Sequence, residues 1–411
     1  MSDKWVADFE TCPVNVENSE ARVWASCVMD IETREVLHLG HDISEFIDFI
    51  YSEKATIYFH NLKFDGKFII PYLLQKGFKQ LSHEDSSKFR YKKRHFECII
   101  DEMGNYYGIN IYWGFNVVID RKKKKKTKKW VKTTILDSYK LLPYKASVIA
   151  DKFLGFKGED GKGKLDDYNR IRPKGYIMNE EEKNYIIKDC EIISLALNDM
   201  FNSGLTKSTV SSNAFNQFLK IKFNGKKQAY RDMLPELDKK TDDFIRESYK
   251  GGWTYVNPKF LNIRNKKVSG TTFDVNSLYP SVMYKYPMPY GTPEEFEGKY
   301  IEDKEHPLYI QKIHITRFKL RKNKFPMIQI KNNSRFTDTE YLTEGENVYL
   351  TATNIDLQLI KECYLLAGVT YIKGLKFRAC NNLFKEYIDK YIQQKIMAGK
   401  LGNGALREQP N

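Results

Sequence analysis

The stretch "FHNLKFDG", residues 59–66, joins the end of an apolar run to the start of a helical pattern. The preceding "ATIYFH" is rich in β-branched and aromatic residues and predicts a strand, whereas "FDGKFIIPYLLQKGF" predicts a helix. Asp65 therefore stands in the first turn of a helix that follows a strand. Asn61 offers an amide and Phe64 an aromatic face, and both suit a single-stranded 3′ end. Packing in the core is the alternative for Phe64.

Two further acidic patterns flank this stretch. Asp8 and Glu10 lie two residues apart in the predicted strand "KWVADFE", so both side chains point to one face. Asp189 lies one turn after Tyr185 in a helix predicted over about residues 180–201, so these two also share a face. Neighbouring carboxylates repel each other unless a cation lies between them. Solvated surface carboxylates are the alternative for each pattern taken alone.

The acidic patterns together predict a site for phosphoryl transfer. Carboxylates from two strand ends and two helices are expected to bind two divalent ions about 4 Å apart. Hard oxygen ligands suit Mg²⁺ or Mn²⁺. Tyr185 would orient the attacking water. The predicted ligands are Asp8, Glu10, Asp65 and Asp189.

The first 200 residues alternate predicted strands and helices, which is typical of an α/β domain. Asp42 is the predicted N-cap of a helix over residues 43–54, and Asn179 with Glu182 forms a capping-box pattern. The basic run "RKKKKKTKK" (121–129) is expected at a hairpin tip, as a solvated loop or as a loop that contacts phosphates. The stretch "SGLTKSTVSSNAFN" is expected to be a link to a region of strands and turns, with a helix near the end of the sequence.

Composition narrows the class of partner. A chain of 411 residues exceeds one compact core, so two or three domains are expected, and the net charge of +14 favours an anionic partner such as nucleic acid. The six cysteines form no C-x-x-C pair and the seven histidines no H-x-x-x-H, which disfavours a zinc site. No apolar run approaches the length of a membrane span and no signal-peptide core is present. We expect a cytoplasmic protein that does not act at a membrane.

The second half of the chain carries another candidate site. In "TTFDVNSLYPSVMY" (271–284), Asp274 ends an apolar, strand-like run and is half of what a metal site needs. Further upstream, "SYKGGWTYVNPKF" contains Tyr249 and the glycines Gly251 and Gly252. Paired glycines allow a backbone to approach DNA closely, and a structural turn is the alternative.

The order D-x-E, N-x-x-F-D, Y-x-x-x-D resembles the three exonuclease motifs of the DnaQ-like 3′–5′ proofreading domain, which has an RNase H-like fold. "YFHNLKFDG" is similar to the second of these motifs in the protein-primed family B DNA polymerases of bacteriophages. The resemblance implies a catalytic lysine in "GEDGKGKLDDY", either Lys162 or Lys164, with Lys164 favoured. It also implies contacts with single-stranded DNA at Thr11, Tyr58, His60, Ser138, Tyr139 and Tyr168.

The later stretches resemble the polymerase part of the same family. "YKGG" resembles the Y-x-G-G motif between exonuclease and palm, and "FDVNSLYP" resembles polymerase motif A. The resemblance implies that Asp274 and the carbonyl of Val275 bind the catalytic metals. It places Ser277 and Leu278 along the triphosphate, with the ring of Tyr279 under the sugar. Residues 291–375 resemble the first insertion peculiar to protein-primed polymerases, which packs near the DNA and the terminal protein.

Motif B, with its triphosphate-binding lysine, and the Y-x-D-T-D strand of motif C do not occur in these 411 residues. "FTDTEYL" (336–342) imitates motif C, but it lies inside the insertion with Glu340 in place of the second aspartate, so we interpret it as a loop. The predicted fold is an RNase H-like α/β exonuclease domain followed by a truncated α+β palm with an inserted subdomain. The predicted ranges are 1–202 for the exonuclease, 203–290 for the linker and start of the palm, 291–375 for the insertion and 376–411 for the truncated palm and start of the fingers.

The leading functional hypothesis is the N-terminal part of a protein-primed, DNA-directed DNA polymerase for DNA replication, with a two-metal 3′–5′ exonuclease and incomplete polymerisation. Its expected partners are single-stranded and primer–template DNA, a terminal protein, deoxynucleoside triphosphates if the polymerase is completed, and a separate C-terminal polymerase fragment. A stand-alone exonuclease and a non-catalytic remnant that binds DNA or terminal protein are the alternatives.

Overall fold

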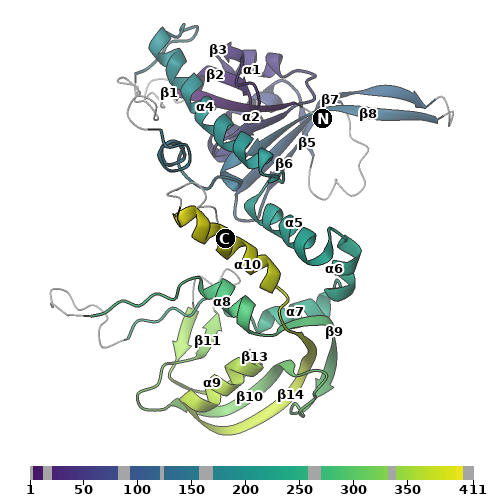
Figure 1. Ribbon diagram of the computed structural model, residues 1–411, viewed down its shortest axis with the longest axis vertical. Coiled ribbons are helices and arrows are strands. Elements are labelled where there is room, and N and C mark those ends of the chain that lie inside the picture. The colour runs from purple at the N-terminus through teal and green to yellow at the C-terminus, as the bar shows by residue number, and fades with distance from the viewer. Residues whose placement is uncertain are drawn as a thin grey trace. The chain divides into compact units, whose positions relative to one another are not determined.

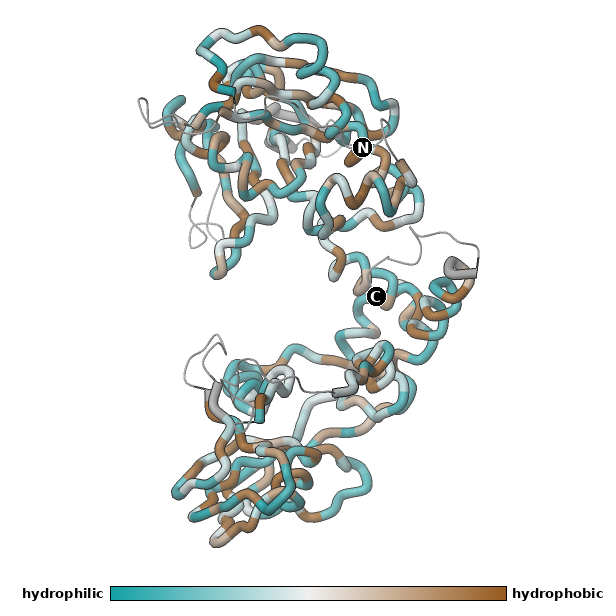
Figure 2. The backbone as a smooth tube through the Cα atoms, turned by 90° about the vertical axis from the view of Figure 1, so that its left-hand side faces the viewer, coloured by the Kyte–Doolittle hydropathy of each residue, from teal (hydrophilic) through white to brown (hydrophobic). Residues whose placement is uncertain are grey.

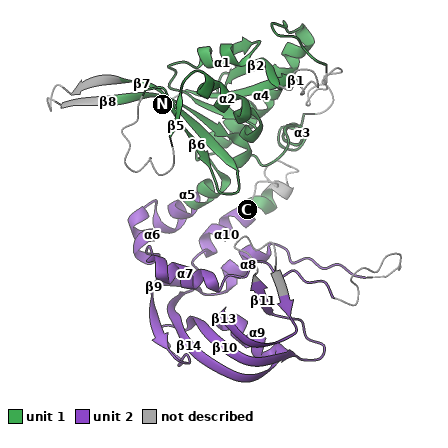
Figure 3. Ribbon diagram, turned by 180° about the vertical axis from the view of Figure 1, so that it is seen from behind, with its two compact units in different colours: residues 1–215, 393–411 green, residues 216–392 purple. Residues whose placement is uncertain are grey.

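The computed structural model describes residues 3–12, 21–81, 93–120, 125–156, 170–257, 270–331 and 339–400. The chain divides into two compact units (Figure 3): unit 1 is residues 1–215 with 393–411, and unit 2 is residues 216–392. The division after residue 215 comes later in the sequence than the boundary at residue 202 predicted above.

Unit 1 is built on a mixed, eight-stranded sheet with the strand order β3-β2-β1-β4-β8-β7-β6-β5 (Figure 1). In its centre β1, β4 and β8 run parallel to one another. Their carboxyl ends therefore meet at one edge of the sheet, which is where side chains from all three strands come together. The strands are β1 (Lys4–Cys12), β2 (Arg22–Asp30), β3 (Val36–Gly40), β4 (Thr56–Phe59), β5 (Lys79–Leu81), β6 (His95–Ile100), β7 (Tyr106–Asp120) and β8 (Lys125–Asp137).

Helices cover both faces of this sheet, because successive side chains of a strand point in opposite directions. On one face Trp5, Ala7 and Phe9 of β1 pack in a cluster with residues of α1 and α2. On the other face Val6 of β1 packs in a cluster with residues of α4. Asp8 has the same parity as Val6 and belongs to the α4 face. The helices are α1 (Ile43–Phe49), α2 (Leu62–Gln75), α3 (Ala146–Val148), a π-helical turn (Ile149–Phe153) and α4 (Glu180–Asn202).

The start of α4 is fixed by a buried ion pair. The predicted capping box between Asn179 and Glu182 is confirmed. The guanidinium of Arg172, which is 1 % exposed, places both Nε and Nη2 at 2.8 Å from Oε1 of Glu182 and lies 3.9 Å from the ring centre of Trp24. A buried ion pair with two charge-assisted contacts to one carboxylate oxygen resists displacement, because removal of either partner leaves an uncompensated charge. The helix that carries Asp189 therefore has a defined origin.

The predicted N-cap at Asp42 and the predicted hairpin are also confirmed, but residues 125–129 of the lysine run belong to strand β8 and not to a loop at its tip. Asp42 accepts hydrogen bonds from the amides of Ser44 and Glu45 at the start of α1. β7 and β8 pair in antiparallel fashion as far as Asp120 opposite Lys125. Residues 121–124 of the lysine run lie outside the described residues, so whether the run contacts phosphates stays a prediction.

The segment 203–216, expected to be a link, lies where the two units divide but is not irregular throughout. Its second half begins α5 (Val210–Phe223), which α6 (Lys227–Met233) and α7 (Lys239–Glu247) follow. The polar residues act as helix-start groups: the hydroxyl of Thr209 accepts the amide hydrogen of Ser212 at 3.1 Å, and the side-chain oxygen of Asn213 accepts that of Lys207 at 2.9 Å. Ser, Thr and Asn favour linkers and helix starts alike, which explains the misreading.

Unit 2 contains a four-stranded antiparallel sheet with the order β13-β10-β14-β9. Residues of α9 pack in the cluster under this sheet, and Phe244 and Ile245 of α7 pack beside Ile310. The segment 339–342, interpreted above as a loop, is strand β12, which pairs with β11. The elements are α8 (Leu278–Lys285), β9 (Met288–Glu297), β10 (Leu308–Leu320), β11 (Ile328–Lys331), β12 (Thr339–Leu342), β13 (Glu344–Thr353), α9 (Asn354–Cys363), β14 (Tyr364–Cys380) and α10 (Lys385–Lys400).

Hydropathy along the chain alternates on a short scale. In Figure 2 hydrophobic and hydrophilic residues alternate along both units, without one long hydrophobic segment. None of the helices in the described ranges has the length and apolar character needed to cross a bilayer.

Candidate metal centre

Three of the predicted ligands come together at the carboxyl-end edge of the central strands. Asp8 and Glu10 lie on β1 and Asp189 lies on α4, on the sheet face that α4 covers. One carboxylate oxygen from each of these residues lies within 4.8 Å of the others. Glu10 and Asp189 are 4 % and 7 % exposed. Buried carboxylates at this spacing repel strongly and need positive charge between them.

The fourth predicted ligand, Asp65, lies in the first turn of α2, immediately after β4. It is 2 % exposed, and its Oδ1 is buried with no hydrogen-bond partner among the residues that the structure describes. Burial raises the pKa of Asp65 well above its usual range, and the charges of Asp8 and Glu10 raise it further. An orphaned, buried carboxylate oxygen beside other carboxylates is costly in a folded protein unless a ligand satisfies it.

The donor set fits a hard divalent cation. All four candidate ligands are carboxylates, and no histidine or cysteine belongs to the grouping of Asp8, Glu10 and Asp189. Mg²⁺ and Mn²⁺ prefer such oxygen donors, whereas zinc sites are usually built from nitrogen and sulfur. The buried oxygen of Asp65 gives a further position at which a cation would relieve an unsatisfied group.

Sequence reasoning missed one buried carboxylate of this edge, Asp137. It ends β8, directly opposite Phe59 at the end of β4, and is 3 % exposed. Its Oδ1 accepts amide hydrogens from Asn61 at 3.0 Å, Leu62 at 3.2 Å and Tyr139 at 3.0 Å. Burial raises the pKa of Asp137. The signal in the sequence was the aspartate of "ILDS", at the end of a strand, but its partners lie about 75 residues earlier.

Hydrogen bonds also fix the loop between β4 and α2. Nδ1 of His60 lies 3.0 Å from the hydroxyl of Ser138, and its Nε2 lies 2.7 Å from the carbonyl oxygen of Tyr144. The hydroxyl of Ser138 donates to the carbonyl oxygen of Phe59 at 3.0 Å. The His60 ring lies 5.5 Å from that of Tyr139. His60 is therefore held by Ser138, Tyr144 and Tyr139. Its predicted contact with DNA stays a prediction.

Two aromatic side chains at this edge are open to solvent. Phe64 is 45 % exposed and Tyr139 is 39 % exposed. The core-packing alternative for Phe64 is therefore wrong, because its ring contacts only the partly buried Phe68 among the aromatic pairs described. Thr11 is half-buried at a β-bulge after Glu10, and Asn61 is exposed with a left-handed backbone (φ 70°). The roles of these four residues in DNA binding stay predictions.

Two of the residues predicted to contact DNA are buried. Tyr58 is 4 % exposed and its ring lies 5.7 Å from that of Phe201, inside the cluster that includes α4. Burial raises the pKa of Tyr58 to about 12. Ser138 is 0 % exposed, with its hydroxyl engaged by His60 and Phe59. Ser138 and Tyr58 adjoin the loop that carries His60 and Asn61, and their roles in DNA binding stay predictions.

A comparison with known proteins decides the family. The model of the family described as "DNA polymerase type B, organellar and viral" matches residues 48–409 of the chain. The chain belongs to this family. The DNA polymerase of Bacillus phage M2 is 40 % identical over 391 residues, which cover 94 % of this chain and 63 % of that protein. The resemblance to protein-primed family B polymerases of bacteriophages is thus confirmed, and the chain spans less than two thirds of this relative's length.

Solved structures agree with the assignment to the type B polymerases. The structure of phi29 DNA polymerase complexed with primer-template DNA and incoming nucleotide substrates has a TM-score of 0.83 at 36 % identity, over 100 % of this chain and 67 % of that one. The phi29 DNA polymerase complexed with single-stranded DNA has a TM-score of 0.81 at 36 % identity, over 99 % of this chain and 66 % of that one.

In unit 2 of this type B polymerase chain, the residues that resemble motif A are exposed. Asp274 and Ser277 lie at the surface, and Ser277 has a left-handed backbone (φ 51°) before α8. The exposed fractions of Val275, Leu278 and Tyr279 are 59 %, 51 % and 75 %. Asp274 does not join a grouping of three or more metal-binding side chains in the described part of the chain. Its role in metal binding stays a prediction.

The Y-x-G-G stretch is also exposed. Tyr249 is 63 % exposed, and Gly251 has a positive φ of 73°, which side-chain-bearing residues rarely adopt. A Cβ added at Gly252 would meet no atom within 4 Å in the described structure. Packing against described residues therefore does not require glycine at this position. Tyr185 lies on α4, one turn before Asp189, as predicted, and it is half-buried. Lys162, Lys164 and Tyr168 lie outside the described residues, so the choice of lysine stays open.

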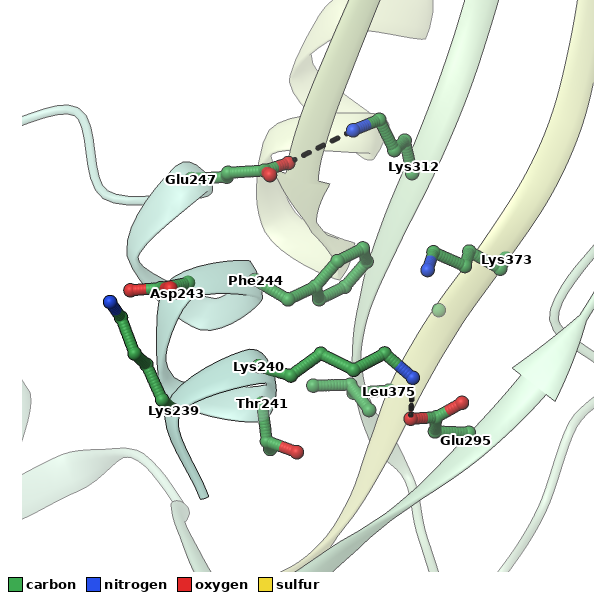
Figure 4. Close-up of a pocket in the computed structure, with 11 residues that line it drawn as sticks. Lys239, Lys240, Thr241, Asp243, Phe244, Glu247, Glu295, Lys312, Lys373 and Leu375 are labelled. Atoms are coloured by element: carbon green, nitrogen blue, oxygen red, sulfur yellow. Dashed lines mark hydrogen bonds and ion pairs between the residues drawn. The ribbon is translucent and has the colours of Figure 1, made fainter. Parts of the chain in front are cut away.

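Unit 2 also contains a hollow of about 490 Å³ between α7 and the sheet (Figure 4). Lys240 lies 3.3 Å from Glu295, and Lys312 lies 3.2 Å from Glu247. In each pair the glutamate offsets the charge of the lysine. None of the residues predicted above for catalysis or DNA binding lines this hollow. We therefore assign it no function in the type B polymerase.

Proposed function

We propose that this chain is the N-terminal part of a protein-primed, DNA-directed DNA polymerase for replication, and that unit 1 is its RNase H-like 3′–5′ proofreading exonuclease. The observation that carries the proposal is the group of Asp8, Glu10 and Asp189 within 4.8 Å, together with Asp65, whose pKa is raised by burial and further by the charges of Asp8 and Glu10. Sites of this kind, at the carboxyl ends of parallel strands, suit chemistry on a phosphodiester.

Each side chain at the edge of unit 1 has a role in this proposal. Asp8, Glu10, Asp65 and Asp189 would hold two Mg²⁺ or Mn²⁺ ions, and these ions, when bound, stabilise charge on the phosphate and acidify a water. Tyr185 would orient the attacking water, and Lys164 or Lys162 would assist it. Phe64 and Tyr139 present exposed rings on which the bases of a single-stranded 3′ end would stack. The other proposed contacts with the DNA are Thr11, Tyr58, His60, Asn61, Ser138 and Tyr168.

Unit 2 would supply part of the polymerase. We propose that Asp274 and the carbonyl of Val275 bind catalytic metal, that Ser277, Leu278 and Tyr279 line the nucleotide site, and that Tyr249 with Gly251 and Gly252 contacts DNA. The solved phi29 complexes contain primer–template and single-stranded DNA, which supports DNA as the partner of this chain as well. Terminal protein is the proposed partner of residues 291–375. Polymerisation by the 411 residues is proposed to be incomplete.

Degradation of single-stranded DNA is the direct test. The purified chain is expected to release mononucleotides from the 3′ end of a 5′-labelled oligonucleotide with Mg²⁺ or Mn²⁺, and to stop when EDTA is added. An oligonucleotide with a blocked 3′ terminus is the matched substrate control. Absence of metal-dependent release with the unblocked oligonucleotide would overturn the exonuclease assignment.

Phe64→Ala is expected to weaken the binding of single-stranded DNA about tenfold, because one stacked base contributes about 1–3 kcal/mol. The measurement is fluorescence anisotropy of a labelled oligonucleotide in EDTA, which keeps the DNA intact. Tyr51→Ala is the control, because Tyr51 is a 60 % exposed aromatic residue of the same unit outside the predicted DNA contacts. Equal affinities of the wild type and Phe64→Ala would contradict the stacking role.

A further inference from the structure

The first turn of α2 lacks a cap of its own. A helix start leaves amide hydrogens without intrahelical partners, and a side chain at the N-cap usually accepts one or two of them. In α2 the N-cap is Asn61, whose left-handed backbone (φ 70°) makes no side-chain cap hydrogen bond. The amides of Asn61 and Leu62 instead donate to Asp137, which belongs to a different strand.

Asp137 holds two segments at the same oxygen. Besides the start of α2, its Oδ1 accepts the amide hydrogen of Tyr139, and Asp137 itself is only 3 % exposed. A buried carboxylate with three amide donors is a strong, directional anchor. The strand register, Phe59 opposite Asp137, places this anchor level with the end of β4.

Asp65 follows Leu62 by three residues, within the same first turn of α2. Its carboxylate has a buried, unsatisfied oxygen, so no hydrogen bond at that oxygen fixes its direction. The position of Asp65 relative to Asp8 and Glu10 is therefore set by the backbone of this turn. Catalytic groups need placement within about 0.5 Å, and displacement by about 1 Å can cost about a hundredfold in rate.

We propose that Asp137 is a positioning residue, whose carboxylate anchors the first turn of α2 and so sets Asp65 against Asp8 and Glu10. The inference rests on the proposed exonuclease function. Asp137 does not belong to the group of three carboxylates within 4.8 Å, and its Oδ1 is engaged by amides, so it acts through Asp65 and not as a ligand itself.

Three variants separate geometry from charge. Asp137→Asn keeps an oxygen acceptor in place and removes the charge, Asp137→Glu keeps the charge but moves it by one methylene, and Asp137→Ala removes the acceptor. A positioning role predicts that Asp137→Asn keeps a kcat within about threefold of the wild type, whereas Asp137→Ala and Asp137→Glu each lose about a hundredfold in kcat. A role for charge predicts the reverse order for Asn and Glu.

Mn²⁺ binding, followed by electron paramagnetic resonance without DNA, is the second readout. The same order is expected: affinity close to wild type for Asn, and about tenfold weaker for Glu and Ala, because loss of one well-placed supporting group typically costs ten- to a hundredfold in metal affinity. Asp42→Ala is the matched control, since Asp42 also accepts two amide hydrogens at a helix start of unit 1, but α1 carries none of the candidate ligands. It should leave kcat and Mn²⁺ affinity unchanged.

The outcomes decide the proposal separately from the exonuclease. The positioning role would be overturned if, in both kcat and Mn²⁺ affinity, Asp137→Asn were as weak as Asp137→Ala, or Asp137→Ala were equal to wild type. If circular dichroism shows that Asp137→Ala does not fold, the order of Asp137→Asn and Asp137→Glu decides. If wild type degrades no DNA, the exonuclease proposal fails, and the order of Mn²⁺ affinities still supports or overturns the role of Asp137.

Discussion

Asp65→Asn is expected to lower the rate of 3′-end degradation by about a thousandfold or more and, in the same protein, to raise the thermal unfolding midpoint of the metal-free chain. The loss follows because removal of one carboxylate removes charge that holds the cations needed to stabilise the reacting phosphate. The gain follows because the same carboxylate is 2 % exposed, lies beside Asp8 and Glu10, and has an unsatisfied buried oxygen.

The pH dependence of this gain has a definite sign. In the unfolded chain Asp65 titrates near the ordinary carboxylate pKa of about 4, whereas burial raises its pKa in the folded chain. The stability that Asp65 contributes is therefore fully present below the unfolded pKa and is lost as pH rises through the folded pKa. Asparagine carries no charge, so the advantage of Asp65→Asn is expected to be small near pH 4 and to grow to about 1–3 kcal/mol near pH 7.

Thermal unfolding in EDTA across this pH range, together with the oligonucleotide assay, measures both effects. Asp48→Asn is the control, because Asp48 is an exposed aspartate of α1 outside the carboxylate group. Added Mn²⁺ should stabilise the wild type more than Asp65→Asn, since a ligand that binds only the folded state raises its stability. Asp65→Asn that is less stable than wild type at pH 7 in EDTA, or that keeps wild-type activity, would show that Asp65 does not belong to a metal site.

Local patterns in the sequence were sufficient to predict the candidate ligands. The two-residue spacing of Asp8 and Glu10 places both side chains on one face of the strand. The capping box at Asn179 fixes where α4 begins, and the helical repeat from that start determines the face on which Asp189 lies. Both features depend on residues within one element. The role of Asp137 depends instead on the parallel pairing of β4 with β8, between segments almost eighty residues apart, and no local periodicity encodes that pairing.

The burial of Tyr58 was within reach of the sequence. Ile57 and Phe59 point to the α1–α2 face, so the alternation of a strand places Tyr58 on the α4 face, where Phe201 covers it. The alternation predicts that Tyr58 is buried, which the structure shows. Similarity to DNA-contacting positions of the family predicts a contact with DNA, and that stays a prediction. The helix that begins at Val210, inside the expected link, was not predicted, because Ser, Thr and Asn occur in linkers and at helix starts alike.

Residues 1–411 alone are expected not to extend a primer, at a level at least about a thousandfold below a complete polymerase. Two cations about 4 Å apart beside a triphosphate need more than one carboxylate to offset their repulsion. Asp274 supplies one, at an exposed position, and within the described ranges the grouping of three or more metal-binding side chains lies elsewhere, at Asp8, Glu10 and Asp189.

The triphosphate would also lack a positive partner, because the lysine of motif B does not occur in the 411 residues. The measurement is incorporation of deoxynucleotides on a primed template by the Asp8→Ala variant, in which degradation cannot hide synthesis. Asp8→Ala with Asp274→Ala is the paired control, since any extension that survives loss of Asp274 does not come from motif A. Template-directed extension that Asp274→Ala abolishes, by this chain without a partner, would contradict the proposal. Extension that appears only when a polypeptide with motifs B and C is added would support it, because that polypeptide supplies the second aspartate and the lysine that complete the charge balance around Asp274.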